Sequence, residues 1–114
     1  MNLFDQLFRS SIPQTEPEEV KKNLQQNPKP LILDVRQPYE YQNGHIQGAK
    51  LIPLGDLPAK IDQLPRNREI VCVCQSGSRS SSAAHHLISA GYKVRNMQGG
   101  MDLWQRSGFP IQRG

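Results

Sequence analysis

Short apolar segments alternate with helix-forming segments along most of the chain, and this alternation limits the possible folds more than any other feature. The apolar segments are rich in aliphatic and β-branched residues, as buried strands are. They lie at residues 31–35, 49–52, 69–73 and 92–96. The helix-forming segments lie at residues 15–26, 38–43, 54–64 and 80–90, with a last short helix after Gly99 and Gly100. Strands that alternate with helices predict an α/β fold with a mainly parallel sheet flanked by helices.

The beginning of the chain predicts two helices. Apolar residues at helical spacing indicate a short amphipathic helix over residues 2–9. We interpret residues 1–11 as a helical extension that packs on the protein, with docking to a partner or a membrane surface as the alternative. Thr15 and Glu18 form a capping-box pattern at the start of the next helix. A length of 114 residues suits one compact domain, which we assign to residues 12–114.

Two cysteines and the absence of long apolar segments indicate a cytoplasmic protein. Cys72 and Cys74 are two positions apart, which is an awkward geometry for a disulfide. The three histidines and the two cysteines lack the spacing of metal ligands. No segment has the length of a membrane span or the pattern of a secretion signal. We therefore expect no metal, no organic cofactor and no membrane span.

The charge is unevenly distributed. The formal net charge is +4, and the whole excess lies in residues 71–114. The basic residues are dispersed and form no run, which argues against a nucleic-acid partner. The excess suits a small anionic substrate, although charge that only increases solubility would give the same count.

The segment best suited to binding or catalysis is the Cys74 loop, residues 74–79. Cys74 directly follows a predicted strand, and ligands of parallel sheets bind at the carboxyl ends of strands. Four small or polar residues separate Cys74 from Arg79 at the start of a helix: Gln75, Ser76, Gly77 and Ser78. Backbone N–H groups around the glycine and in the first helical turn would favour a thiolate or hold an anion. Arg79 would add a positive charge, and Ser80 would add a hydroxyl donor.

An inert role is the alternative for each cysteine. A buried cysteine before a serine-rich helix start would need no chemistry, but the combination with glycine and arginine favours a site. Cys72 lies inside the predicted strand, where a small core side chain is the better interpretation. A second, resolving thiol remains the other option for Cys72.

Taken together, the motifs resemble the rhodanese domain superfamily, in particular its single-domain sulfurtransferases. The resemblance extends over about residues 12–110. It rests on Leu33-Asp34-Val35-Arg36, Glu40-Tyr41, Gly44-His45-Ile46, Gly48-Ala49, Ile52-Pro53, the Cys74 loop with Ser80, and Gly99-Gly100 with Trp104. The resemblance implies a doubly wound α/β fold and no cofactor.

The same resemblance implies a reaction. Cys74 would attack the outer sulfur of thiosulfate or another persulfide donor and become a persulfide. Cyanide, a small thiol or an acceptor protein would then remove the sulfur. The amides of residues 75–79 would stabilise the sulfur, Arg79 would assist with the anion, and Asp34 and Arg36 would support the site, with Arg36 near its entrance.

Two other functions compete with sulfur transfer. Related phosphatases and arsenate reductases have a loop one residue longer between cysteine and arginine, so the shorter loop here favours sulfur chemistry. Many rhodanese-like domains are non-enzymatic binding modules or sulfur carriers, often without the cysteine. This chain keeps Cys74, Gly77 and Arg79, which favours an enzyme.

Overall fold

Five parallel strands form the centre of the structure, a computed structural model that describes residues 12–114. The strand order is β1-β5-β4-β2-β3, and every strand pairing is parallel. The strands are β1 (Gln14–Thr15), β2 (Leu31–Asp34), β3 (Lys50–Leu51), β4 (Ile70–Val73) and β5 (Val94–Met97). The predicted α/β fold with a parallel sheet is confirmed. The helix predicted at residues 2–9 lies outside the described residues.

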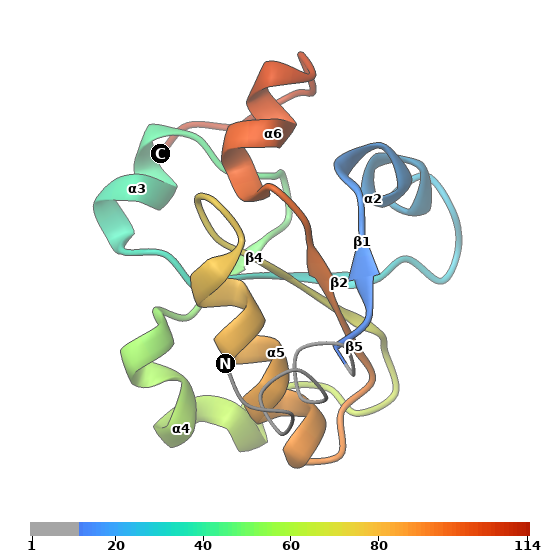
Figure 1. Ribbon diagram of the computed structural model, residues 1–114, viewed down its shortest axis with the longest axis vertical. Coiled ribbons are helices and arrows are strands. Elements are labelled where there is room, and N and C mark those ends of the chain that lie inside the picture. The colour runs from blue at the N-terminus through green and yellow to red at the C-terminus, as the bar shows by residue number, and fades with distance from the viewer. Residues whose placement is uncertain (1–11) are drawn as a thin grey trace, which may run out of the picture.

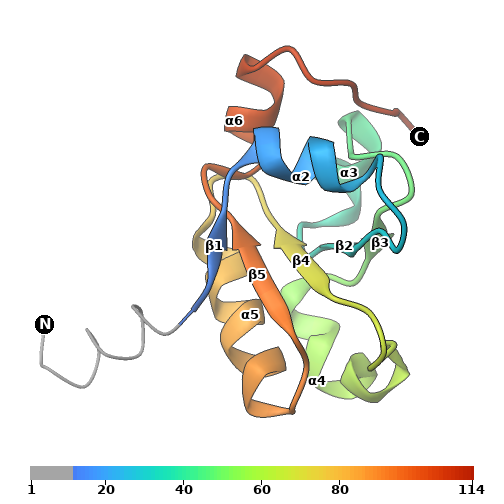
Figure 2. The ribbon, with the colours of Figure 1, turned by 90° about the vertical axis from the view of Figure 1, so that its right-hand side faces the viewer.

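Helices cover both faces of the sheet, as Figures 1 and 2 show. They are α2 (Pro17–Asn23), α3 (Pro38–Asn43), α4 (Leu57–Lys60), α5 (Ser78–Ser89) and α6 (Gly100–Arg106). Because side chains of a strand alternate between faces, β4 contributes to two hydrophobic clusters. Ile70 and Cys72 pack with α4 and α5 on one face, while Val71 and Val73 pack with α2 and α6 on the other. Within residues 12–114 no helix has the length and apolar character needed to cross a bilayer.

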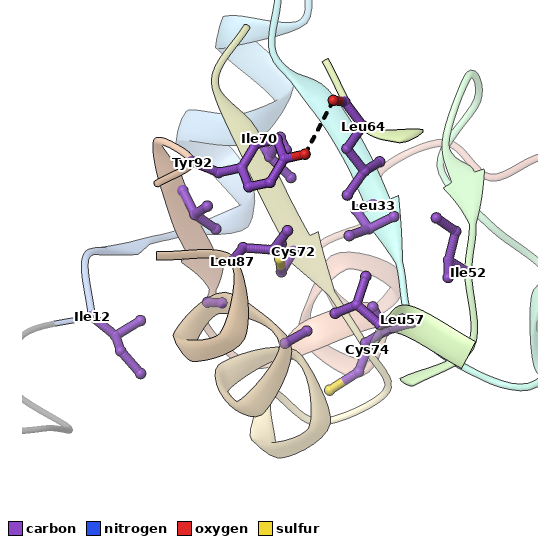
Figure 3. Packing of buried hydrophobic residues seen from close by; sticks show 14 residues of the cluster. Ile12, Leu33, Ile52, Leu57, Leu64, Ile70, Cys72, Cys74, Leu87 and Tyr92 are labelled. Atoms are coloured by element: carbon purple, nitrogen blue, oxygen red, sulfur yellow. Dashed lines mark hydrogen bonds between the residues drawn. The ribbon is translucent and has the colours of Figure 1, made fainter. Parts of the chain in front are cut away.

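The cluster on the α5 side leads directly to the Cys74 loop. Figure 3 shows Cys72 and Cys74 in this cluster beside Leu57 and Leu87. Both cysteines are fully buried and point to the same face, as residues two positions apart in an extended segment do. On the opposite face Trp104 is buried, and its indole N–H donates to the carbonyl of Pro110 over 2.9 Å. Trp104 is therefore a core residue.

Three local predictions need correction. Thr15 belongs to β1, and the next helix begins after Glu16 without a side-chain cap, so the capping box is wrong. The Thr15 hydroxyl instead accepts a hydrogen bond from Arg95 over 3.1 Å. The helix predicted at 54–64 is divided into a 3-10 turn (Leu54–Asp56), α4 and a second 3-10 turn (Ile61–Gln63). The strand predicted at 92–96 begins and ends later, as β5.

Candidate active site

The Cys74 loop connects the carboxyl end of β4 to the start of α5. Gly77 is the residue before the helix, and its φ of 113° is one that favours glycine over other residues. A Cβ atom at Gly77 would also lie 3.5 Å from the backbone nitrogen of Gly99. The loop can therefore turn sharply and bring the first turn of α5 next to Cys74.

The Cys74 sulfur lies among hydrogen-bond donors. The backbone N–H of Gly77 donates to Sγ over 3.0 Å, and the Ser80 hydroxyl lies 3.3 Å from Sγ. The N–H groups of Ser78, Arg79 and Ser80 open α5, so they have no carbonyl one turn earlier in the helix. Such donors, together with the helix dipole, stabilise negative charge on a ligand or a sulfur atom.

The Ser80 hydroxyl has a second acceptor, the Gly77 carbonyl, at 3.1 Å. One hydroxyl proton serves one acceptor at a time. The Gly77 carbonyl also accepts from the Ser81 hydroxyl over 2.9 Å and from the Ser81 N–H over 3.1 Å. It is therefore already satisfied without Ser80, which leaves the Ser80 hydroxyl available to the Cys74 sulfur.

Helix α6 contacts the other side of the loop. The N–H of Met101 donates to the Cys74 carbonyl over 2.8 Å, and the N–H of Asp102 donates to the Gln75 carbonyl over 3.0 Å. Gly100 permits this approach, because a Cβ at its position would overlap both carbonyl oxygens. The glycine pair that marked the family resemblance thus lies against the loop.

Asp34 and Arg36 form a buried ion pair beneath the loop. Arg36 Nη2 lies 2.8 Å from Asp34 Oδ2, and Nε adds a bond of 3.0 Å to Oδ1. The guanidinium also donates to the Gly44 carbonyl over 2.9 Å and to Gln75 Oε1 over 3.0 Å. Arg36 is only 2% exposed. Asp34 and Arg36 therefore form a buried pair that contacts the loop through the Gln75 side chain.

Arg79 is paired with Glu40 of α3. Its two terminal nitrogens each lie 2.8 Å from a Glu40 carboxylate oxygen. Hydrogen bonding to Arg79, supported by the Gln37 N–H and opposed by burial, lowers the pKa of Glu40 to about 2. The same pairing raises the pKa of Arg79. The arginine charge is thus balanced by a carboxylate from a helix distant in the sequence.

The remaining loop residues differ in exposure. Ser76 and Ser78 are exposed, whereas the Gln75 side chain is half-buried and bonded to Arg36 and Asp102. Cys72 is a free thiol in the core, and burial, followed by the proximity of Cys74, raises its pKa. The described part of the chain contains no group of three His, Cys, Asp or Glu side chains placed to hold a metal ion.

Comparison with known proteins places the chain in a family. The rhodanese-like domain family matches residues 16–107. A sulfurtransferase of Allochromatium vinosum is 35% identical over 95 residues, which cover 82% of this chain and 89% of the relative. Thiosulfate sulfurtransferase GlpE of Stutzerimonas stutzeri is 32% identical over 78 residues, 68% of this chain and 72% of the relative.

A solved structure supports the same conclusion. The rhodanese-related protein of Thermoplasma volcanium superposes with a TM-score of 0.83 at 27% identity, covering 88% of this chain and 97% of that protein. The fold and the site define an α/β protein with a cysteine at the carboxyl end of a central strand. The chain belongs to the rhodanese-like domain family, whose members related to it include sulfurtransferases.

Proposed function

We propose that this protein is a thiosulfate sulfurtransferase that carries the transferred sulfur on Cys74 as a persulfide. The observation that carries the proposal is the environment of Sγ, which faces the Gly77 N–H and the Ser80 hydroxyl at the start of α5. Donors of this kind stabilise both a thiolate and a terminal persulfide sulfur. Relatives that are sulfurtransferases, one of them for thiosulfate, support the choice.

The reaction would have two halves. The Cys74 thiolate attacks the outer sulfur of thiosulfate, a new S–S bond forms, and sulfite leaves with the electron pair of the old S–S bond. Cyanide or a thiolate then attacks the outer persulfide sulfur and regenerates the Cys74 thiolate. This is covalent catalysis with ping-pong kinetics, and it needs no metal or redox partner. Keeping Cys74 as a thiol suits the reducing cytosol.

The loop would hold the substrate mainly by backbone donors. The amides of residues 75–79 and the first turn of α5 would face the anionic end of thiosulfate. Because Arg79 is paired with Glu40, the pair has no net charge, and Arg79 would contribute only the local positive potential of its guanidinium. A second candidate, a sulfur carrier that exchanges sulfur with a protein partner, would use the same persulfide.

Intact-mass spectrometry tests the proposal directly. We expect the protein to gain one sulfur atom after treatment with thiosulfate and to lose it on addition of cyanide. Cys74→Ser should gain none, while Cys72→Ala should gain one. If the native chain gains no sulfur although Cys74 can be alkylated, thiosulfate is the wrong donor. Cys74-dependent turnover of p-nitrophenyl phosphate would instead favour a phosphatase.

A further inference from the structure

We infer that Gln75 is a positioning residue, whose side-chain amide holds the Cys74 loop between Arg36 and Asp102 in the orientation that directs the loop amides toward the sulfur. The sequence suggested for this residue only that it belongs to the anion-binding loop and that its backbone amide stabilises the sulfur. The inference rests on the proposed function only where sulfur transfer is measured. The rate of Cys74 alkylation can be measured without a sulfur donor.

The two ends of the Gln75 amide have different partners. Its oxygen accepts from Arg36 Nη1 over 3.0 Å, and its nitrogen donates to Asp102 Oδ1 over 2.6 Å. The amide thus lies between a cation and an anion with its dipole in the favourable direction. Arg36 is itself fixed by Asp34 and by the Gly44 carbonyl. The side chain of Gln75 therefore connects α6 to a rigid ion pair at the end of β2.

The backbone of the same residue is held by α6. The carbonyls of Cys74 and Gln75 accept from the N–H groups of Met101 and Asp102. A trans peptide is planar, so its N–H points away from its C=O. Holding these two carbonyls against α6 therefore directs the N–H groups of Gln75 and Ser76 away from α6, on the opposite side of the loop backbone. Asp102 contributes to both interactions, through its own N–H and through its carboxylate.

A neutral amide suits this position better than a charged side chain. A glutamate would keep the contact with Arg36 but would place a carboxylate oxygen against Asp102. A lysine or an arginine would meet Arg36. An aliphatic side chain of the same length would leave Arg36 Nη1 without its acceptor, and a buried unpaired donor is unfavourable. The structure thus explains why an amide stands directly after the cysteine.

The first test compares Gln75→Met with the matched control Gln63→Met in the exposed second 3-10 turn. The rate of Cys74 alkylation by iodoacetamide is measured as a function of pH, followed by kcat and KM with thiosulfate. We expect Gln75→Met to raise the pH midpoint of alkylation and to lower kcat/KM about tenfold, since small losses of alignment are costly. Gln63→Met should match the unsubstituted chain. If Gln75 had only a structural role, Gln75→Met would change the melting temperature but neither the pH midpoint of alkylation nor kcat/KM.

The second test separates positioning from charge and does not depend on the methionine variant. Gln75→Glu should resemble Gln75→Met. The double variant Gln75→Glu with Asp102→Asn should recover most of the loss, because the new asparagine amide would donate to the new glutamate carboxylate while Arg36 keeps its acceptor. Asp102→Asn alone should retain most activity, since Gln75 can still donate to the amide oxygen.

Two results would overturn the inference: an unchanged Gln75→Met, or a double variant no better than Gln75→Glu. Failure of the proposed function has a different signature, because the unsubstituted chain would then accept no sulfur. The alkylation profiles would still decide the role of Gln75 in that case.

Discussion

Replacement of Glu40 by glutamine removes the charge that balances Arg79 while it preserves shape. The glutamine oxygen can still accept from the Gln37 N–H, as the Glu40 carboxylate does over 3.0 Å. Of the two short bonds to Arg79, the one to the glutamine oxygen loses its ionic character, and the other is lost because the amide nitrogen is a donor that faces Arg79 Nη2. The substitution therefore removes the charge and one hydrogen bond of the contact between α3 and the Cys74 loop with little change in side-chain volume.

The size of the effect follows from the pKa and the exposure of the pair. Without solvent screening, a fall of the Glu40 pKa from 4.5 to about 2 would correspond to roughly 3 kcal/mol of stability. The Arg79 side chain is 35% exposed and that of Glu40 is 15% exposed. Solvent therefore screens the pair, and we expect Glu40→Gln to lower the free energy of unfolding by about 1–2 kcal/mol at pH 7.

The pH dependence has a defined sign. The folded pKa of Glu40 lies below its ordinary value of 4.5, so the stabilisation is complete above that value and is lost as the pH falls toward about 2. Urea unfolding at pH 7 and at about pH 3 should therefore show the difference between the two chains falling below half. Glu18→Gln, in the exposed first turn of α2, should cost less than about 0.5 kcal/mol. Equal differences at both pH values would show that packing, not charge, holds Glu40.

Two further substitutions test the contacts around Cys74. Gly100→Ala should lower the free energy of unfolding by about 2 kcal/mol or more, because the φ of Gly100 is 55° and a Cβ would lie 2.5 Å from the Gln75 carbonyl oxygen. The control Gly55→Ala, at a position with open space around it, should change the free energy of unfolding by less than about 0.5 kcal/mol. Equal stability of the two variants would refute the close approach of Gly100 to the loop. Cys72→Ala should cost about 1 kcal/mol in urea unfolding, because the residue is fully buried, and should still form the Cys74 persulfide; failure of the folded variant to do so would give Cys72 a part in the chemistry.

The sequence predicted the three central strands β2, β4 and β5 well because they are buried on both faces. Such strands are near-continuous apolar runs, which are easy to find. The two-residue strand β1 has no such run, and Thr15 carries the hydroxyl of a helix cap, so the local pattern favoured the wrong element. The helix at 54–64 contains Gly55 and Pro58, which weaken or end helices, and the structure divides it near them.

The Cys74 loop could be predicted from a local pattern as well, because its residues are contiguous in the sequence. The partners of the loop are not. Glu40 and Arg36 lie 39 residues away from the loop residues they bind, and Asp102 lies 27 residues from Gln75. No local pattern connects such residues, because their contacts depend on how α3, β2 and α6 pack. Local patterns therefore indicated the Cys74 loop but not Glu40 or Asp102 as its partners, and Arg36 was indicated only by the family resemblance.

The carboxylates of Asp34 and Glu40 also determine which charges act on the Cys74 sulfur. Arg36 is neutralised by Asp34, and Arg79 is neutralised by Glu40. The groups left to face Cys74 are neutral donors, namely backbone N–H groups and the Ser80 hydroxyl. Hydrogen-bond donors that the fold holds in place can stabilise negative charge on Sγ and, after sulfur transfer, on the outer persulfide sulfur. Neither step requires a long charged side chain to move. Paired arginines thus suit a site in which the negative charge moves by one sulfur atom during each half of the proposed cycle.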